Sequence, residues 1–177
     1  SCSPPFKAAG KGFDLKLKAV QWVSDSDSDL SDNPVTPNFI LSGIDMSHSL
    51  VAPSDGQAGS IDVTSLDLTD GDNGEKTLDQ AVSEVGVFTF TADPPDGAYF
   101  GHTIPVATSD NVGRFTPDHF KQEVTYKGRF EGACAGEFTY FGQKFGYGMG
   151  EEPKTEIQAY NAEEGKTKNY SRTFLYI

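Results

Sequence analysis

The sequence is poor in basic residues, and the shortage is concentrated in one part of the chain. Residues 1–112 contain five lysines and no arginine against 17 acidic side chains, whereas residues 113–177 contain nine basic and nine acidic side chains. Nucleic acids and anionic membrane surfaces bind basic patches, so the net charge of −12 argues against both as partners. The change in charge balance predicts a boundary near residue 112.

Long apolar runs and cysteines are also scarce. No stretch approaches the roughly 18 to 20 apolar residues that a membrane-spanning helix needs. No basic segment precedes an apolar one, so we expect the chain to begin downstream of any export signal. Two cysteines, Cys2 and Cys134, are too few to define a disulfide framework. They could be free, pair with each other or pair with cysteines outside this sequence.

Motifs for catalysis are missing as well. The sequence has no Gly-x-Ser-x-Gly, no phosphate-binding glycine loop and no cysteine and histidine pair in a catalytic context. His48, His102 and His119 are scattered without the spacing of zinc ligands, and we expect each to be structural or exposed. These absences predict a protein that is not an enzyme.

What the sequence does contain is a pattern that it uses twice. Four residues recur at an offset of 132: Cys2, Phe6, Gly10 and Phe13 return as Cys134, Phe138, Gly142 and Phe145. Further on, residues 15–20 resemble residues 155–160, and residues 36–39 resemble residues 167–170; the first copy holds nine more residues between these two matches. A period of this length suits a tandem array of domains. A chance match of common residue types is the alternative.

Strand patterns dominate both parts of the chain. Residues 13–20 alternate apolar and polar side chains without a fault, which is typical of a half-buried strand. Further strand-like runs are residues 39–44, 61–68, 85–92, 99–106, 121–127, 138–141, 155–160 and 173–177, and Asp-Gly or Asn-Gly pairs mark turns between several of them.

The fold class that these runs predict is all-β. We expect an immunoglobulin-like antiparallel β-sandwich over residues 1–112, either complete or without its first strand. Residues 113–177 would then hold the opening strands of a second, truncated repeat.

A single segment has helical spacing. Leu78, Ala81, Val82 and Val85 stand at i, i+3, i+4 and i+7, and Thr77 with Gln80 resembles a capping box. We expect one short helical turn here, connecting two strands.

An aspartate-rich segment is the strongest candidate for a ligand site. Asp25, Asp27, Asp29 and Asp32 fall in the nine-residue insertion of the first copy. Alternate aspartates on a loop can turn their oxygens toward a hard cation, so they predict a calcium site. The spacing does not match an EF-hand, and a solvated acidic loop is the alternative.

A second acidic group consists of Asp67, Asp70, Asp72 and Glu75. It begins like a calcium loop but lacks the carboxylate at the twelfth position, where Ala81 stands. Turn chemistry explains it better.

The aromatic residues allow two interpretations. The group comprises Trp22, Tyr99, Phe100, Phe138, Tyr140, Phe141, Phe145 and Tyr147. Aromatic side chains at strand spacing usually belong to a core, which is our expectation. The alternative is a set of exposed rings that stack on a sugar.

Three segments resemble a known family. Residues 112–120 read Val-Gly-Arg-Phe-Thr-Pro-Asp-His-Phe, residues 138–145 read Phe-Thr-Tyr-Phe-Gly-Gln-Lys-Phe, and Ala-Tyr-Asn-Ala at 159–162 leads to Thr-Lys-Asn-Tyr at 167–170. They resemble the repeat region of the MSHA (mannose-sensitive haemagglutinin) pilus biogenesis protein Q family. The resemblance is best over residues 112–170. It implies a large exported protein of a Gram-negative bacterium, with a lectin-like module elsewhere and a β-rich region without established site residues.

Together these observations favour a non-enzymatic, extracellular or cell-surface β-sandwich segment of a pilus-associated protein. It would act as a structural or adhesive spacer. Its expected partners are neighbouring repeats of the same chain, pilus components or surface glycans. The alternative is a calcium-dependent glycan-binding module.

Overall fold

The protein is almost entirely β-structure. The computed structural model describes residues 4–24, 26–27, 29–131, 140–142 and 144–170. Within these ranges there is no α-helix, and the helical content is limited to two 3₁₀ turns, η1 (Leu30–Asp32) and η2 (Asp70–Asp72). The prediction of an all-β chain is confirmed.

The larger sheet is curved and mixed, like half of a barrel. Its strands lie in the order β1 (Lys7–Ala8), β8 (Val112–Thr116), β6 (Gly86–Asp93), β3 (Leu41–Ala52) and β4 (Ser65–Leu68), and β7 (Ala107–Thr108) pairs with β6. The pairing of β1 with β8 is parallel and the other pairings are antiparallel. A second sheet consists of β2 (Phe13–Lys18) and β5 (Glu75–Gln80), which pair antiparallel.

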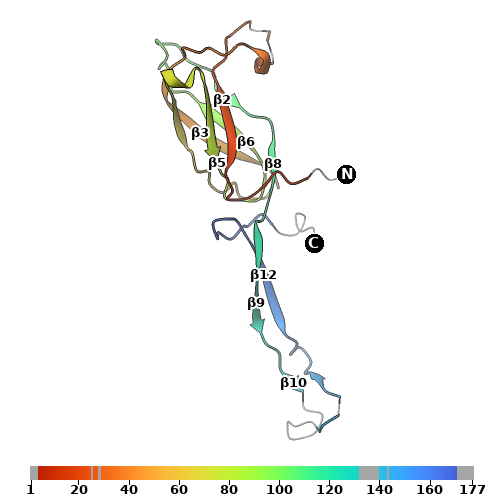
Figure 1. The fold of residues 1–177 in the computed structure, drawn as a ribbon. Helices are drawn as coiled ribbons and strands as arrows, with labels where there is room; N and C mark the ends of the chain where they lie inside the picture. The colour runs from red at the N-terminus through yellow and green to blue at the C-terminus, as the bar shows by residue number, and fades with distance from the viewer. Residues whose placement is uncertain (1–3, 25, 28, 132–139, 143, 171–177) are drawn as a thin grey trace.

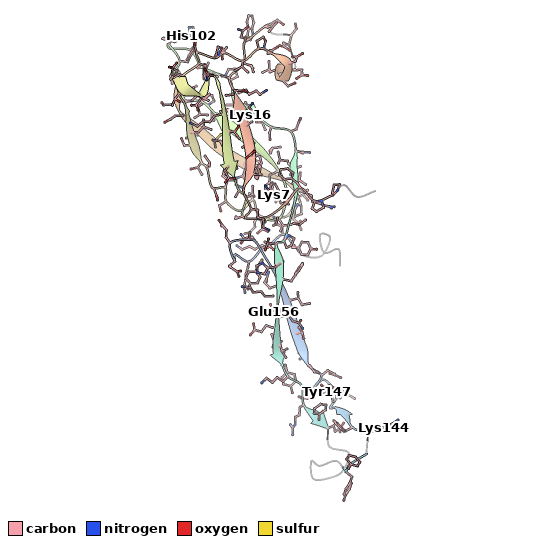
Figure 2. All side chains as sticks on the ribbon, in the orientation of Figure 1. Lys7, Lys16, His102, Lys144, Tyr147 and Glu156 are labelled. Carbon is pink, nitrogen blue, oxygen red and sulfur yellow. The ribbon has the colours of Figure 1, made fainter. Side chains whose placement is uncertain are left out.

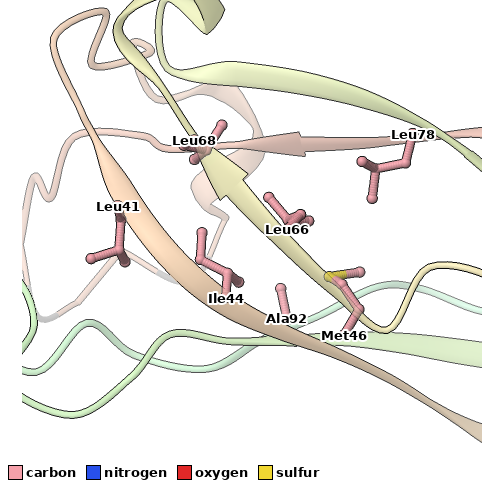
Figure 3. Packing of buried hydrophobic residues seen from close by; sticks show 7 residues of the cluster. All are labelled: Leu41, Ile44, Met46, Leu66, Leu68, Leu78 and Ala92. Carbon is pink, nitrogen blue, oxygen red and sulfur yellow. The ribbon is translucent and has the colours of Figure 1, made fainter.

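The two sheets share one core. One cluster of buried residues combines Leu78 of β5 with side chains of β3, β4 and β6, as Figure 3 shows. A second cluster combines Phe13 of β2 with Phe88 and Phe90 of β6 and Phe115 of β8. Burial of these large apolar side chains holds the sheets together. We call this part, residues 4–116, the body.

A two-stranded ribbon projects from one end of the body (Figure 1). β9 (His119–Tyr126) and β12 (Lys154–Tyr160) pair antiparallel, and β10 (Phe130–Glu131) pairs with β11 (Gly146–Tyr147) farther out. An isolated two-stranded hairpin is marginally stable in water. The ribbon therefore depends on how its near end is attached to the body.

Most of the predicted strands in the described residues are present. β2, β3, β4, β6, β9 and β12 overlap the runs predicted at 13–20, 39–44, 61–68, 85–92, 121–127 and 155–160. The strand predicted at 99–106 is wrong, because this segment forms only a bridge between Tyr99 and His102. Residues 140 and 141 are not in a strand, and the remainder of the run at 138–141 and the run at 173–177 lie outside the described residues.

The predicted helical turn at residues 78–85 is also wrong. Leu78 and Gln80 are both buried on one face of strand β5, and Val82 forms a bridge with Ile61. Gln80 is polar, so it conceals the alternation of the strand. The buried residues that follow it produce an accidental helical spacing.

Two finer expectations stay predictions. The mixed half-barrel contains a parallel pair, β1 and β8, and the strand order does not by itself make it an immunoglobulin-like sandwich. The predicted boundary after residue 112 falls at the start of β8, which pairs with β6 of the body.

The repeated sequence pattern has a structural counterpart. The bridge between Val20 and Val35 corresponds to the bridge between Tyr160 and Lys166. Two backbone hydrogen bonds recur beside it: Thr36 N to Ala19 O (2.8 Å) matches Thr167 N to Ala159 O (3.0 Å), and Gln21 N to Pro34 O (2.9 Å) matches Asn161 N to Gly165 O (2.8 Å). Both copies therefore close the same loop, with the nine extra residues inside the first.

Candidate functional site: the junction of body and ribbon

The ribbon is attached to the body by a cluster of buried polar residues. Where the chain leaves β12, residues 161–169 turn back against the end of the body. The polar side chains buried here are Glu84 of the body and Asn161, Thr167 and Asn169 of the returning segment. We call this contact the junction. Buried polar groups are costly unless they are hydrogen-bonded, so their partners decide its strength.

Glu84 is the acceptor at the centre of the junction. The residue is 5% exposed and lies in the connection between β5 and β6. Oε1 accepts the backbone N–H groups of Val85 (2.9 Å), Lys168 (3.1 Å) and Asn169 (3.2 Å), and Oε2 accepts that of Lys168 (2.9 Å). One carboxyl group thus gathers backbone donors from two segments more than 80 residues apart in the sequence.

Asn169 makes the reciprocal contact from the ribbon side. Its Oδ1 accepts the backbone N–H of Gln57 (2.7 Å). Its Nδ2 donates to the carbonyl oxygens of Gln57 (2.7 Å) and Val85 (2.8 Å). The side-chain amide therefore pairs with the Gln57 backbone as a neighbouring strand would, and the residue is 4% exposed.

Asn161 shapes the returning loop and fixes it to the body. Its Oδ1 accepts the N–H groups of Glu163 (3.1 Å) and Gly165 (2.7 Å), while Nδ2 donates to the carbonyl oxygen of Ser83 (2.9 Å). The same side chain thus orders the turn and holds it against the segment that carries Glu84.

The backbones approach closely at Gly10. Ala162 donates its N–H to the carbonyl oxygen of Ala9 (2.9 Å), and Gly10 has a φ of +78°. A Cβ atom at Gly10 would lie 3.0 Å from the nitrogen of Ala162. Both the positive φ and the lack of space favour glycine at this position.

Ion pairs surround the junction at its exposed edge. Lys11 of the body lies 2.8 Å from the carboxylate of Asp118 at the start of the ribbon. The hydrogen bond from Lys11, with a second from His119, holds the pKa of Asp118 below its ordinary value. Lys121 pairs with Glu164, which raises the pKa of Lys121 and lowers that of Glu164. Exposed pairs of this kind add little stability individually.

The arrangement is suited to holding two parts of a chain in a fixed relation. Its groups are amides, backbone N–H and C=O groups and one carboxyl group, and most satisfy one another. The exception in the described residues is Thr167 Oγ1, which is buried without a hydrogen-bond partner.

The described part of the predicted calcium loop, which includes η1, lies at the end of the body opposite the ribbon (Figure 1). Asp29 caps η1 and accepts from the N–H (3.0 Å) and hydroxyl (2.6 Å) of Ser31, which lowers the pKa of Asp29. Asp27 accepts from Asn33 Nδ2 (2.7 Å), and Asp32 is an exposed residue of η1.

Asp25 lies outside the described residues. Across the residues that are described, no three histidine, cysteine or acidic side chains come together as a metal site. The calcium site stays a prediction.

The second acidic group forms turn structure in part: Asp70 and Asp72 belong to η2, whereas Asp67 is in β4 and Glu75 begins β5. Thr69 and Asp72 make a capping box around η2, in which Asp72 accepts from the N–H (2.7 Å) and hydroxyl (2.6 Å) of Thr69. These bonds lower the pKa of Asp72. Its carboxylate is thereby engaged within the turn.

The histidines have separate surroundings. His48 Nε2 lies 2.8 Å from the carbonyl oxygen of Ala58, and its ring packs against Phe88 and Phe90. His119 stacks on Tyr160, and His102 is exposed. The prediction of structural or exposed histidines is confirmed.

The expectation that the aromatic group is core is wrong for most of its described members. Six are exposed: Trp22, Phe100, Tyr140, Phe141, Phe145 and Tyr147. Tyr99 is half-buried, and Phe138 lies outside the described residues. Tyr147 lies at the far end of the ribbon, as Figure 2 shows.

At that end three rings form a cluster. Phe130 stacks on Tyr147 with ring centres 4.6 Å apart, and Phe145 meets Phe130 edge to face at 5.1 Å. A two-stranded ribbon buries each ring on one side only, which explains their exposure.

Sequence reasoning missed Glu84 and Asn161 as junction residues. Polar residue types give no indication of burial when the contact that buries them comes from a distant segment. Asn169 did carry a signal, because it belongs to the repeated Thr-x-Asn-aromatic pattern of residues 36–39 and 167–170.

Fold and junction together define a class: an extended all-β chain whose two parts are joined end to end by buried polar contacts. Residues 1–79 match the family model described as DUF6701, second domain, and residues 84–177 match DUF6701, third domain. The chain belongs to the DUF6701 family. No curated protein and no solved structure matches it.

The two matched regions are interleaved in the structure. β6 and β8 belong to the third-domain match, yet they lie in one sheet with β3 and β4 of the second-domain match. The third-domain match begins at Glu84, the central acceptor of the junction. In the described part of the chain, no helix has the length and apolar composition to cross a membrane.

The junction predicts different consequences for two equivalent asparagines. Asn169→Ala removes three hydrogen bonds and leaves the buried carbonyl group of Val85 and the N–H and carbonyl groups of Gln57 without this partner, so the free energy of unfolding should fall by about 1–3 kcal/mol in urea titrations. Asn38→Ala, at the matching exposed position of the first copy, should change it by less than about 0.5 kcal/mol. Equal changes in the free energy of unfolding for the two substitutions would show that the hydrogen bonds of Asn169 at the junction do not stabilise the protein.

Proposed function

We propose that this chain is a non-enzymatic structural spacer in a tandem array of β domains. The observation that supports it most is the junction, in which one carboxyl group and two side-chain amides fix the ribbon to the body. A chain that only tethered two units could do so through a flexible linker and would need no buried contacts. Buried and mutually satisfied polar groups instead define one orientation.

The arrangement in space is also what a spacer requires. The ribbon leaves the body at the end opposite to the aspartate-rich loop, so successive units would add length (Figure 1). The internal repeat supports an array, because the loop that docks at the junction recurs in the first copy with the same backbone hydrogen bonds.

The wider setting of the proposal comes from the resemblance to the MSHA pilus biogenesis protein Q family. On that basis the array belongs to an exported, pilus-associated protein at the surface of a Gram-negative bacterium, with immunoglobulin-like units. The acidic surface suits this setting, since a net charge of −12 keeps an exposed chain soluble.

Distance measurements between body and ribbon test the spacer. Spin labels can be attached through Ser47→Cys on β3 and Gln122→Cys on β9, after Cys2→Ser and Cys134→Ser have removed the native thiols. Pulsed electron paramagnetic resonance should then give one narrow distribution of the distance between the two labels. Glu84→Ala should broaden it, because the backbone N–H groups of Lys168 and Asn169 lose their acceptor. A broad distribution in the chain with Glu84 intact would contradict a rigid spacer.

A second candidate function is calcium-dependent recognition of glycans. The observation in its favour is the indole ring of Trp22, which is 73% exposed and precedes the aspartate-rich loop by three residues, since sugars stack on exposed aromatic faces. The calcium would be held by the loop of Asp25, Asp27, Asp29 and Asp32.

Under this second proposal, millimolar Ca²⁺ raises the melting temperature by several degrees and Mg²⁺ does not, because a ligand of the folded state stabilises it by mass action. Binding on a glycan array is then lost when Ca²⁺ is chelated. The control is Asp110→Asn, an aspartate outside the loop, which should leave the calcium effect unchanged. An unchanged melt in Ca²⁺ together with no glycan binding would exclude this function.

A further inference from the structure

One end of the body carries a set of exposed residues whose counterparts in the second copy are at the junction. The matched bridges and hydrogen bonds align Gln21 with Asn161 and Thr36 with Thr167. Trp22 then corresponds to Ala162, and Asn38 to Asn169.

The two members of each pair have opposite surroundings. Asn161 and Asn169 are each 4% exposed and donate to body carbonyl groups. Gln21 and Asn38 are exposed, and Trp22, the sole tryptophan of the sequence, is 73% exposed. The same loop is therefore docked in one copy and open in the other. We call the open set, Gln21, Trp22 and Asn38, the free face.

Apolar side chains beside the free face point to a protein partner. Leu30 and Ile40 belong to the same loop region and are both more than half exposed. Scattered exposed apolar residues need no explanation, but in the sequence Leu30 lies between Trp22 and Asn38 and Ile40 follows Asn38, within a segment whose counterpart is already an interface.

We propose that the free face is the docking surface for a preceding domain of the same family. That domain would present the chemistry found here around Gln57, Ser83 and Glu84: a backbone N–H and C=O pair for the Asn38 amide and a carbonyl group for the amide of Gln21. The family numbering supports this partner, because the two matched models are described as the second and third domains of the family. The proposal extends the spacer function and depends on it for the idea of an array.

The two loops differ in one hydrogen-bond donor. Pro37 stands where the second copy has Lys168, so this position has no N–H to donate to a carboxyl group. A carboxyl group equivalent to Glu84 would bind the N–H of Asn38 alone. The larger first-copy loop, with Trp22 in place of Ala162, supplies apolar contact instead.

A loop exchange within the full chain tests the proposal. Residues 161–170 are replaced by the sequence of residues 21–39, and Trp22→Phe at the original position leaves the transplanted tryptophan as the only reporter. If the first-copy loop can dock, this tryptophan should show blue-shifted emission and several-fold weaker acrylamide quenching than Trp22 in the unmodified chain. The matched control carries alanine in place of the transplanted Asn38, which should restore strong quenching.

The result that would overturn the proposal is a folded body, with the urea transition of the unmodified chain, whose transplanted tryptophan is quenched as strongly as Trp22. If the loop exchange prevents folding, a tandem chain tests the proposal instead. It consists of residues 1–133 followed by residues 2–177, and it carries Trp22→Phe in the first copy. There the second Trp22 should be protected. An exposed tryptophan, or failure of the two units to fold, overturns the proposal.

Failure of this inference can be told from failure of the spacer. If the distribution of body-to-ribbon distances is narrow and the transplanted tryptophan is exposed, the spacer function is supported and the proposed docking of the free face is contradicted. A broad distribution of these distances contradicts the spacer function itself.

Discussion

The orientation of the ribbon depends on the hydrogen bonds that Glu84 and Asn169 make across the junction. β9 and β12 form a sheet of two strands, which cannot bury enough surface to be stable alone. Burying a carboxyl group and an amide carries a desolvation cost of several kcal/mol, and this is offset only when their partners are in place. The contact is therefore sensitive to geometry: it is favourable in one orientation and unfavourable in nearby ones. Such a contact specifies an angle between two parts more sharply than apolar packing of the same size would.

The body provides the rigidity that this contact requires. Glu84 lies between β5 and β6, and the flanking residues Val82 and Val85 are buried in the core. The side chain of Gln80, fully buried, binds the backbone of Asp62 and Val63 and so orders the loop that precedes β4. The junction is thus built on the connection where the two sheets meet. The family models place the division between their second and third domains at the same connection, although the strands of both matches share one sheet.

The sequence predicted the parts of the fold that depend on local pattern. Residues 13–18 alternate cleanly, and β2 is where they indicated. The prediction missed strand β5 because the polar residue Gln80 occupies a core position and so hides the alternation of the strand. A helical period then fitted the apolar residues that remained. The junction could not be predicted from residue types, since Glu84 and Asn161 are buried only through contacts with distant segments. The repeat was more informative: it aligned Asn38 with Asn169 correctly, without showing that one is exposed and the other bound. The exposed aromatic residues at the ribbon end were misjudged because strand spacing implies a core only when a second layer covers the strand.

Hydrogen exchange of individual backbone amides in the unmodified chain tests the central claim most directly. The amides of Lys168 and Asn169 donate to Glu84, although both residues lie in an irregular segment. If the junction fixes the ribbon, these two amides should exchange as slowly as those of β6 in the core, because both would open only when the body unfolds. Exchange as fast as that of the exposed Asn38 amide would show that the junction opens independently, and would contradict the account.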